Sequence, residues 1–254
     1  HRQQRRGRRG VSEQDRALSH WAWGWADKFP SREGRENLGQ MVEAMLQLSP
    51  GDLEEPCPEE DAILETPRAL DPPKSLQHIL DTSDAARIRQ TYGRAYPDIV
   101  RGFRGDFSGA PDLVAKPTTT EEIVQVLDWA ADANIAIIPR GGGTSVVGGV
   151  NSAEVHGDWR GVATLDLANM ASVLAIDDVS QAAHIQAGAF GPQLEAQLRE
   201  HDLTLRHFPQ SFDFSTLGGW LATRAGGHFA TVYTHIDDLL QSMRVITPSG
   251  EVET

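Results

Sequence analysis

The stretch Pro139-Arg140-Gly141-Gly142-Gly143-Thr144-Ser145 decides how this 254-residue chain is interpreted. It follows directly on an apolar run at residues 135–138, which predicts a buried strand. Glycines after a strand permit positive φ angles and a close approach of the backbone, so that successive amides can converge on a phosphate. Thr144 and Ser145 add hydroxyl donors. The stretch alone leaves two interpretations open, a phosphate-binding loop and a purely structural turn.

Two familiar phosphate-binding loops do not fit these residues. Gly143 and Gly148 have the interval of a Walker loop, but Gly149 stands where that loop requires a lysine. The Rossmann fingerprint requires a glycine three residues after Gly143, and this chain has Val146 there. Neither of these two classes of nucleotide-binding protein is therefore expected.

The residues around the loop predict alternating strands and helices. An apolar run at 113–115 is followed by overlapping capping boxes at 118–122 and by apolar residues at helical spacing, which predicts a strand and then a helix. A further helix is expected to begin at Pro192. Further strands are expected at 162–167, 173–176 and 184–187, and a hairpin at 242–247 and 251–253. The pattern predicts an α+β fold with α/β-like subdomains.

A second segment of small residues follows later in the chain. Ser215 and Thr216 predict a helix N-cap, and Gly218 and Gly219 lie in the first turn after it. A glycine inside a helix costs about 1 kcal/mol relative to alanine, so an adjacent pair indicates that something flat or bulky lies against the backbone. Two such segments suit a dinucleotide with a pyrophosphate and a planar ring, and tight helix packing is the alternative.

Composition excludes several functional classes. The chain is 39% hydrophobic and 23% charged, and it has no apolar run near the roughly 20 residues that a membrane span needs. The net charge is −13, although five of the first ten residues are arginines, so that the rest carries 18 basic against 36 acidic side chains. Such an acidic body argues against nucleic acid or an anionic membrane as the main partner. The arginine tail is interpreted as solvated.

Residues 1–105 are interpreted as an N-terminal arm rich in loops. Short helices are expected at 35–48, 84–92 and 98–103. Trp21, Trp23 and Trp25 alternate along the chain, which predicts an extended segment with all three indoles on one side. This strip is interpreted as apolar surface that docks the arm on the main domain, with a ligand platform as the alternative. Cys57 is the single cysteine and is interpreted as an inert loop thiol, as is typical of a reducing compartment.

Several motifs in one order make the chain recognisable. They comprise residues 111–114, 139–145, 214–220, 223–226, 235–238 and 245–248. Together they resemble the FAD-binding domain of the vanillyl-alcohol oxidase superfamily, also called the PCMH type. Within it the chain is most similar to the alkyldihydroxyacetonephosphate synthase family and to bacterial FAD-linked oxidases. The resemblance runs from about residue 90, and it implies an arm at 1–105 and an FAD-binding domain at 106–254 that lacks its second half and the cap domain.

The resemblance also implies which residues bind FAD. The pyrophosphate is expected on Pro139, Arg140, Gly141, Gly142, Gly143, Thr144 and Ser145. The flavin and ribityl chain are expected beside Gln210, Ser211, Phe212, Asp213, Phe214, Ser215 and Thr216, and the cradle is completed by Ala222, Thr223, Arg224 and Ala225. Thr144 stands in the loop where the covalent branch of the superfamily has a histidine, so FAD is expected to be non-covalent.

Catalytic residues are not assigned from the sequence. His228 and His235 are considered, with a structural histidine as the alternative for each. No metal is expected at the run formed by His235, Asp237 and Asp238, because it has neither a cysteine nor a second histidine pair.

The leading hypothesis from the resemblance is an FAD-dependent oxidoreductase or flavin-dependent transferase. It is expected either to make an ether lipid precursor from acyl-dihydroxyacetone phosphate and a fatty alcohol, or to oxidise a D-2-hydroxy acid such as lactate or glycolate. A flavin-binding fragment without turnover is the alternative, and a nucleic-acid-binding protein ranks last. The expected partners are small-molecule substrates, with a homodimer left open. A cytoplasmic location is expected, or a peroxisomal one for a eukaryotic synthase, although no targeting signal is found.

Overall fold

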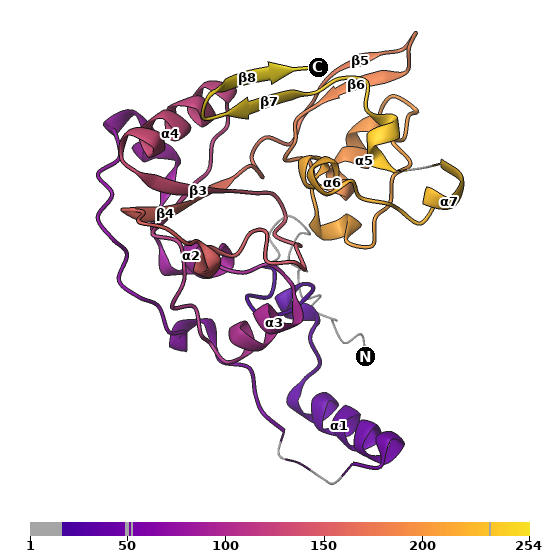
Figure 1. Cartoon of the computed structure of the whole chain (residues 1–254). Coiled ribbons are helices and arrows are strands. Elements are labelled where there is room, and N and C mark those ends of the chain that lie inside the picture. The colour runs from indigo at the N-terminus through magenta and orange to yellow at the C-terminus, as the bar shows by residue number, and fades with distance from the viewer. Residues whose placement is uncertain (1–16, 49–50, 52, 234) are drawn as a thin grey trace, which may run out of the picture.

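A computed structural model describes residues 17–48, 51, 53–233 and 235–254. Its centre is a four-stranded sheet in the order β1-β2-β4-β3 (Figure 1). The strands are β1 (Leu80–Asp81), β2 (Leu113–Ala115), β3 (Ile135–Arg140) and β4 (Gly161–Asp166). β4 runs parallel to both β2 and β3, whereas β1 is an antiparallel edge strand. The parallel strands are nearly continuous apolar runs because they are buried on both faces.

Helix α4 (Thr120–Asp132) connects β2 to β3 and covers one face of the sheet. Thr119 begins it with a capping box, in which the threonine hydroxyl accepts from the Glu122 amide and the Glu122 carboxylate accepts from the Thr119 amide. One face of α4 packs on the sheet through Ile123, Val126, Trp129 and Ala130. β3 lies at the other edge of the sheet from β1. An edge strand accommodates Pro139, because the missing N–H of a proline does not have to pair with a neighbouring strand there.

A second layer follows the sheet in the chain and lies beside it (Figure 1). It has its own core, in which Leu194 and Leu198 of one helix meet Trp220 of another and Ile236 of a later turn. Its elements are β5 (Val173–Asp177), β6 (Ala182–Ile185), α5 (Gly191–Arg199), α6 (Leu217–Thr223) and α7 (Ala230–Tyr233). The hairpin of β7 (Arg244–Thr247) and β8 (Gly250–Glu253) ends the chain, and Ile246 packs on the core of the sheet.

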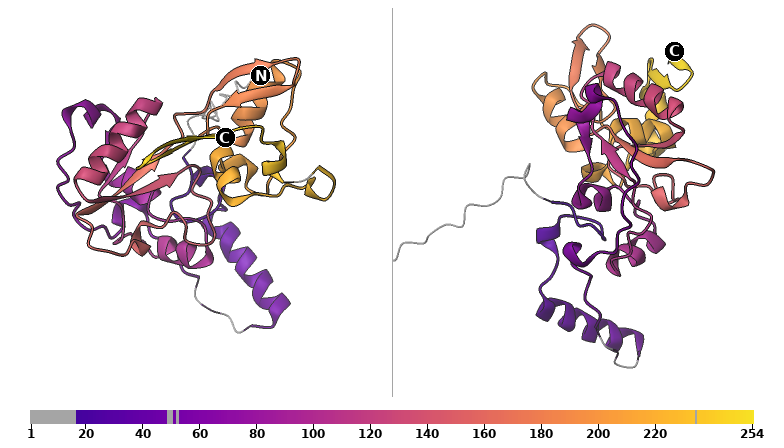
Figure 2. Two further views of the ribbon diagram at one scale, coloured as in Figure 1. Left: turned by 45° about the horizontal axis from the view of Figure 1, so that its top comes forward. Right: turned by 90° about the vertical axis from the view of Figure 1, so that its left-hand side faces the viewer.

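The N-terminal part of the chain contributes short helices that lie near the central sheet. α2 (Asp84–Arg89) and α3 (Tyr96–Phe103) pack on the body, whereas α1 (Arg32–Leu46) projects from it and buries none of its residues (Figures 1 and 2). The described residues also contain six short 3-10 helices: Ala26–Lys28, Glu59–Asp61, Lys74–Ile79, Ser152–Glu154, Phe212–Phe214 and Ile236–Leu239. No helix in the described ranges has the length and apolar character that crossing a membrane requires.

The α+β class is confirmed, and most predicted elements are present with shifted ends. β6 begins at Ala182, two residues earlier than predicted, because Asp177 accepts the amides of Val179 and Ser180 and makes the turn tight. α2 ends at Arg89 and not at Tyr92. The reason is a tertiary contact, because the side chain of Arg140 donates hydrogen bonds to the carbonyls at this end of the helix.

The prediction of one strip of three tryptophans is wrong. Ser19 accepts the amides of Trp21 and Ala22 and bends the chain, and Gly24 has a φ of +102°. The indole of Trp21 packs edge-on against Phe103, whereas Trp23 is exposed. The indole of Trp25 lies 5.6 Å from the ring of Phe214. Trp21 therefore packs within the N-terminal arm, Trp25 joins the segment to Phe214, and Trp23 faces outward.

Candidate functional site

The glycine-rich loop lies at the carboxyl end of β3, against the second predicted segment. A Cβ added to Gly142 would overlap the carbonyl oxygen of Phe214, and one added to Gly141 would overlap the hydroxyl of Thr216. Both positions therefore require glycine for space alone. The fold thus brings together residues 139–145 and 214–216, which the sequence places far apart.

The backbone amides of this loop lack acceptors among the described residues, and Gly143 is itself buried. Within the described part of the chain, no hydrogen bond is donated by the backbone amide of Gly142, Gly143, Thr144 or Ser145. Gly143 has a φ of +66°, a left-handed conformation that turns successive N–H groups toward a common side. The Ser145 carbonyl is held separately, because it accepts the amide of Arg94 at 2.6 Å. The arrangement fits an anion such as a pyrophosphate.

Arg140 supports the loop from inside the protein. Its guanidinium is buried and donates to the carbonyls of Arg89, Gln90 and Tyr92 at 2.8–3.3 Å, at the end of α2. These bonds explain why α2 ends early, since the last carbonyls of a helix lack partners within the helix. A Cβ on Gly143 would overlap this guanidinium. The side chain of Arg140 therefore holds the loop and the helix end together.

The segment from Gln210 to Thr216 forms a tight turn that packs on α6. The ring of Phe212 stacks on Trp220 with 6.2 Å between centroids. Thr216 is 2% exposed and pairs with Phe190 in an isolated bridge. Gln210 and Asp213, by contrast, are exposed. The backbone of the segment is thus fixed while two of its polar side chains face outward.

The last predicted residues lie at the end of α6. Ala222, Thr223 and Arg224 are exposed, and Arg224 adopts a left-handed conformation and donates to Asp237 at 2.7 Å. That hydrogen bond lowers the pKa of Asp237. Ala225 is half-buried, and its amide binds the Trp220 carbonyl. The run from His235 to Asp238 therefore has a structural partner, and no group of ligating side chains among the described residues fits a metal ion.

The adjacent glycines of α6 have different surroundings. A Cβ on Gly218 would lie 2.8 Å from the Cβ of Ala187, so tight packing accounts for this glycine. Gly219 is exposed, and a Cβ there would meet only the Thr216 hydroxyl at 3.6 Å. Helix packing, the alternative interpretation of the pair, therefore holds for the first glycine only.

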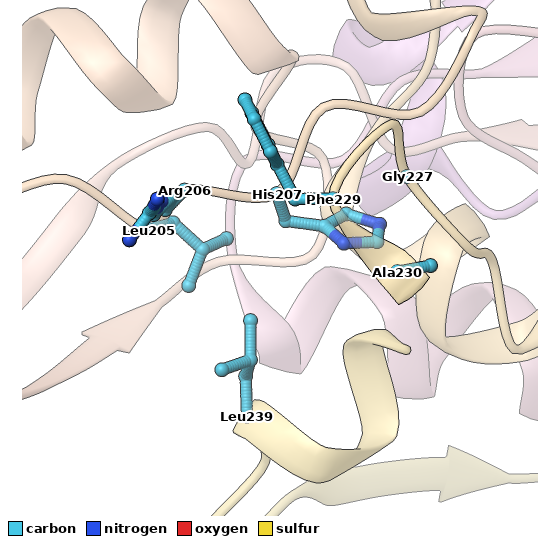
Figure 3. Close-up of a pocket in the computed structure, with 7 residues that line it drawn as sticks. All are labelled: Leu205, Arg206, His207, Gly227, Phe229, Ala230 and Leu239. Atoms are coloured by element: carbon cyan, nitrogen blue, oxygen red, sulfur yellow. The ribbon is translucent and has the colours of Figure 1, made fainter. Parts of the chain in front are cut away.

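A small pocket beside α7 contains a histidine that the sequence reasoning missed (Figure 3). The pocket has a volume of about 110 Å³ and is lined by Leu205, Arg206, His207, Gly227, Phe229, Ala230 and Leu239. His207 is 3% exposed, and its Nε2 has no hydrogen-bond partner within the described residues. Burial lowers the pKa of His207, and the charge of His235 acts in the same direction. Its place directly before the 210–216 segment was the available signal.

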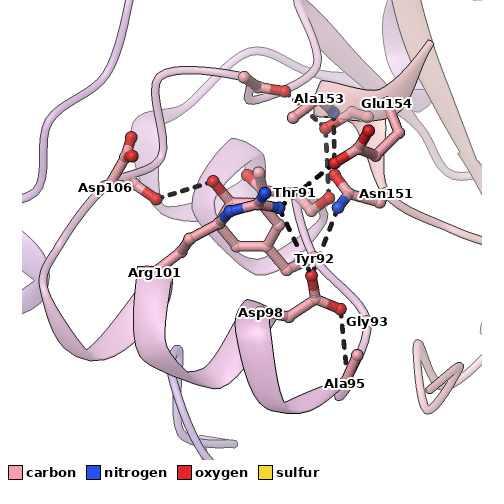
Figure 4. A network of polar contacts seen from close by, with 12 residues as sticks. Thr91, Tyr92, Gly93, Ala95, Asp98, Arg101, Asp106, Asn151, Ala153 and Glu154 are labelled. Carbon is pink, nitrogen blue, oxygen red and sulfur yellow. Dashed lines mark hydrogen bonds and ion pairs between the residues drawn. The ribbon is translucent and has the colours of Figure 1, made fainter. Parts of the chain in front are cut away.

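A polar network anchors the chain where it leaves the loop (Figure 4). The buried carboxylate of Asp98 accepts the Ala95 amide at 3.2 Å and the Asn151 side-chain amide at 3.3 Å. Arg101 lies 3.4 Å from Glu154 and adds an ion pair at the surface. These contacts tie the residues after the loop to α3, so both ends of the loop are fixed.

A glycine-rich loop at the end of a parallel strand, with four amides that lack acceptors among the described residues, is typical of proteins that bind phosphate groups or dinucleotides. Residues 111–254 match the FAD binding domain family, and the chain belongs to that family. The resemblance seen in the sequence and the FAD cofactor of the family are thereby confirmed. Contact of individual residues with FAD remains a prediction.

Alkyldihydroxyacetonephosphate synthases of three organisms and an FAD-linked oxidoreductase are among the similar curated proteins. The alkyldihydroxyacetonephosphate synthase of Dictyostelium discoideum is 40% identical over 168 residues, which is 66% of this chain and 27% of the relative. An uncharacterised FAD-linked oxidoreductase of Escherichia coli is 31% identical over 63% of this chain and 31% of the relative. The chain spans less than a third of the length of these relatives.

Solved structures extend the similarity to the N-terminal part. A structure of alkyldihydroxyacetonephosphate synthase superposes with a TM-score of 0.82 and 32% identity over 93% of this chain and 48% of that chain. A second crystal form of the synthase has a TM-score of 0.80 and covers 98% of this chain. The likeness therefore includes residues before 90, the position from which the sequence alone showed the resemblance.

Proposed function

We propose that this chain is the FAD-binding part of a flavin-dependent enzyme of the alkyldihydroxyacetonephosphate synthase type. The observation that carries the proposal is the row of four amides at 142–145 that have no acceptor among the described residues, in a loop packed against residues 214–216. In this proposal the amides bind the pyrophosphate of FAD. Residues 210–216 and 222–225 lie along the rest of the cofactor.

The residues of the chain supply binding and orientation. FAD, when bound, supplies the redox or group-transfer chemistry. Thr144 and Ser145 offer hydroxyl donors beside the amides, and Thr144 has no ring nitrogen with which to attach a flavin methyl group. The turn of 212–214, fixed on Trp220, gives one side of the cofactor site a rigid backbone. Non-covalent FAD is therefore part of the proposal.

For the substrate we propose acyl-dihydroxyacetone phosphate, with a fatty alcohol as the second reactant. This rests on the 37–40% identity to synthases of three organisms. Oxidation of a 2-hydroxy acid is the second candidate, because the glycolate oxidase subunit of Bacillus subtilis is 27% identical over 68% of this chain. Flavin binding without turnover is a third. A homodimer and a cytoplasmic location stay predictions.

The test begins with flavin binding by the 254-residue chain. Purified protein is incubated with FAD, desalted and examined for absorption near about 450 nm, where oxidised flavin absorbs. Retention of yellow colour supports the proposal, and a colourless protein overturns it. Acid and heat then separate two forms of binding, since non-covalent FAD leaves with the supernatant and covalent flavin remains in the pellet.

The two reactions are distinguished on protein that binds FAD. Bleaching of the flavin colour by lactate or glycolate, without any effect of acyl-dihydroxyacetone phosphate, favours the oxidation of 2-hydroxy acids. The opposite pattern favours the synthase reaction. Flavin that responds to neither class favours binding without turnover.

A further inference from the structure

Two arginines near the glycine-rich loop, the buried Arg140 and the half-buried Arg94, donate to backbone carbonyls. The guanidinium of Arg140 donates to three backbone carbonyls, and that of Arg94 donates to the carbonyls of Gly93 and Ser19. Neither forms an ion pair with a described residue. A buried cation is ordinarily paired, because removing it from water is costly. These two positive charges are therefore neutralised only in part.

The position of Arg140 relates it directly to the open amides. Gly143 lies so close to the guanidinium that a Cβ there would overlap Nη2 and Cζ and would lie 2.7 Å from Nε. Gly143 is also one of the four residues whose amides have no acceptor within the described chain. The guanidinium thus lies against the backbone of a residue whose amide has no acceptor among the described residues.

The surroundings of Arg140 make its charge effective at short range. The group is 4% exposed, so little water screens it. Burial lowers the pKa of Arg140 to about 10, and the neighbouring charge of Arg94 acts in the same direction. The guanidinium still carries its charge at neutral pH. The carboxylates of Asp98 and Asp166 act on it only at longer range.

We propose that Arg140 supplies the positive charge that selects phosphate at this loop, acting through the backbone and without touching the ligand. The inference rests on the proposed binding of FAD at residues 142–145. It also explains how a protein with 36 acidic and 23 basic side chains binds a dianionic pyrophosphate. The favourable field is local and comes from the buried Arg140, whereas the net charge acts at a distance through solvent.

The experiment compares FAD with riboflavin, which has the same ring and no phosphate. Dissociation constants are measured by flavin fluorescence for the wild type, Arg140→Gln and Arg140→Lys. We expect Arg140→Gln to weaken FAD binding by about tenfold or more and riboflavin binding by less than about threefold. Arg140→Lys keeps the charge and is expected to keep the ratio of the two constants.

Arg87→Gln is the matched control. Arg87 is as buried as Arg140 and also donates to backbone carbonyls, those of Pro111 and Glu65. Unlike Arg140 it pairs with a carboxylate, that of Asp84, and none of its hydrogen bonds within the described residues reaches the loop. This variant is expected to lower the melting temperature and to leave the ratio of the FAD and riboflavin constants unchanged. Circular dichroism verifies the fold of each variant.

The outcomes separate this inference from the proposed function. A wild type that binds neither flavin overturns the proposed function itself. If FAD binds and Arg140→Gln weakens both ligands equally, Arg140 is only structural and the inference fails. If Arg140→Gln does not fold, the measurement on Arg140→Lys tests the inference instead. This variant keeps the positive charge, so a loss of its preference for FAD over riboflavin would contradict a role of the charge.

Discussion

The indole N–H of Trp220 donates a 2.7 Å hydrogen bond to the hydroxyl oxygen of Ser215, and both side chains are buried. The Ser215 hydroxyl in turn donates to the Ser211 carbonyl at 2.8 Å. This chain of bonds connects the core of the second layer to the backbone of residues 211–215. The segment proposed to lie beside the flavin is therefore positioned by the interior of the protein.

Ser215→Ala is expected to destabilise the fold. It leaves the indole N–H of Trp220 buried without an acceptor, which costs about 1–3 kcal/mol. Urea unfolding followed by circular dichroism measures the free energy of unfolding. Ser180→Ala, in the exposed turn between β5 and β6, is the control and is expected to change that free energy by less than about 0.5 kcal/mol. Equal losses in the two variants would contradict the prediction.

Gly142→Ala is expected to weaken FAD binding by roughly tenfold or more, because the added methyl group displaces the loop from Phe214. Gly149→Ala is the control in the same region. A Cβ there would lie 3.3 Å from the hydroxyl of Ser145, which can rotate. Flavin fluorescence measures both constants. An unchanged affinity of Gly142→Ala for FAD would contradict the prediction that this loop binds the cofactor.

The ion pair of Asp81 and Lys116 is expected to make stability depend on pH. Lys116 binds Asp81 at 2.6 Å, and this hydrogen bond, followed by that of Ser83, lowers the pKa of Asp81 to about 2. The folded state therefore binds fewer protons than the unfolded state between about pH 4 and pH 2. The stabilisation is complete above that window and is lost as the pH falls through it.

Lys116→Met tests this dependence. Because both side chains are about one-third exposed, solvent screening limits the effect to about 0.5–1 kcal/mol. Urea unfolding at pH 6 and pH 2.5 is expected to show a smaller loss in Lys116→Met than in the wild type. Lys74→Met removes an exposed lysine without an ion pair in the described chain and is expected to behave as the wild type.

Asp112 is expected to hold the N-terminal part on the sheet. Its buried carboxylate accepts the backbone amide of Arg68 and that of Val162, each at 2.8 Å, and pairs with the Arg68 side chain. Asp112→Ala leaves these amides without an acceptor, and we expect a loss of about 1–3 kcal/mol in the free energy of unfolding.

Limited proteolysis provides a second readout for Asp112→Ala. Cleavage within residues 56–73 is expected to become faster than in the wild type, because this segment loses its anchor. Asp71→Ala removes an ion pair with Arg160 at the exposed surface and is the control. Equal cleavage rates in Asp112→Ala and the wild type would show that the anchor lies elsewhere.

Local patterns predicted much of the fold. The apolar run at 113–115 is β2, and the capping box of Thr119 and Glu122 begins α4. Both elements depend on residues that are neighbours in the sequence. The spacing of apolar side chains and the capping residues at a helix end are therefore sufficient to predict them. Contacts between residues that are far apart in the sequence could not be predicted from local patterns. The antiparallel edge strand β1 is two residues long and carries no periodic signal.

For the candidate site, the glycines and hydroxyls that follow a strand predict the loop at 139–145 from the residues alone, whereas the segment at 210–216 was predicted only through the resemblance to the FAD-binding family. The tertiary structure decided three further features. It placed Phe214 on Gly142, turned Arg140 inward onto the end of α2, and buried His207 in a pocket. Each depends on side chains that are distant in the chain and meet only after the two layers have packed, and no local pattern specifies such a meeting.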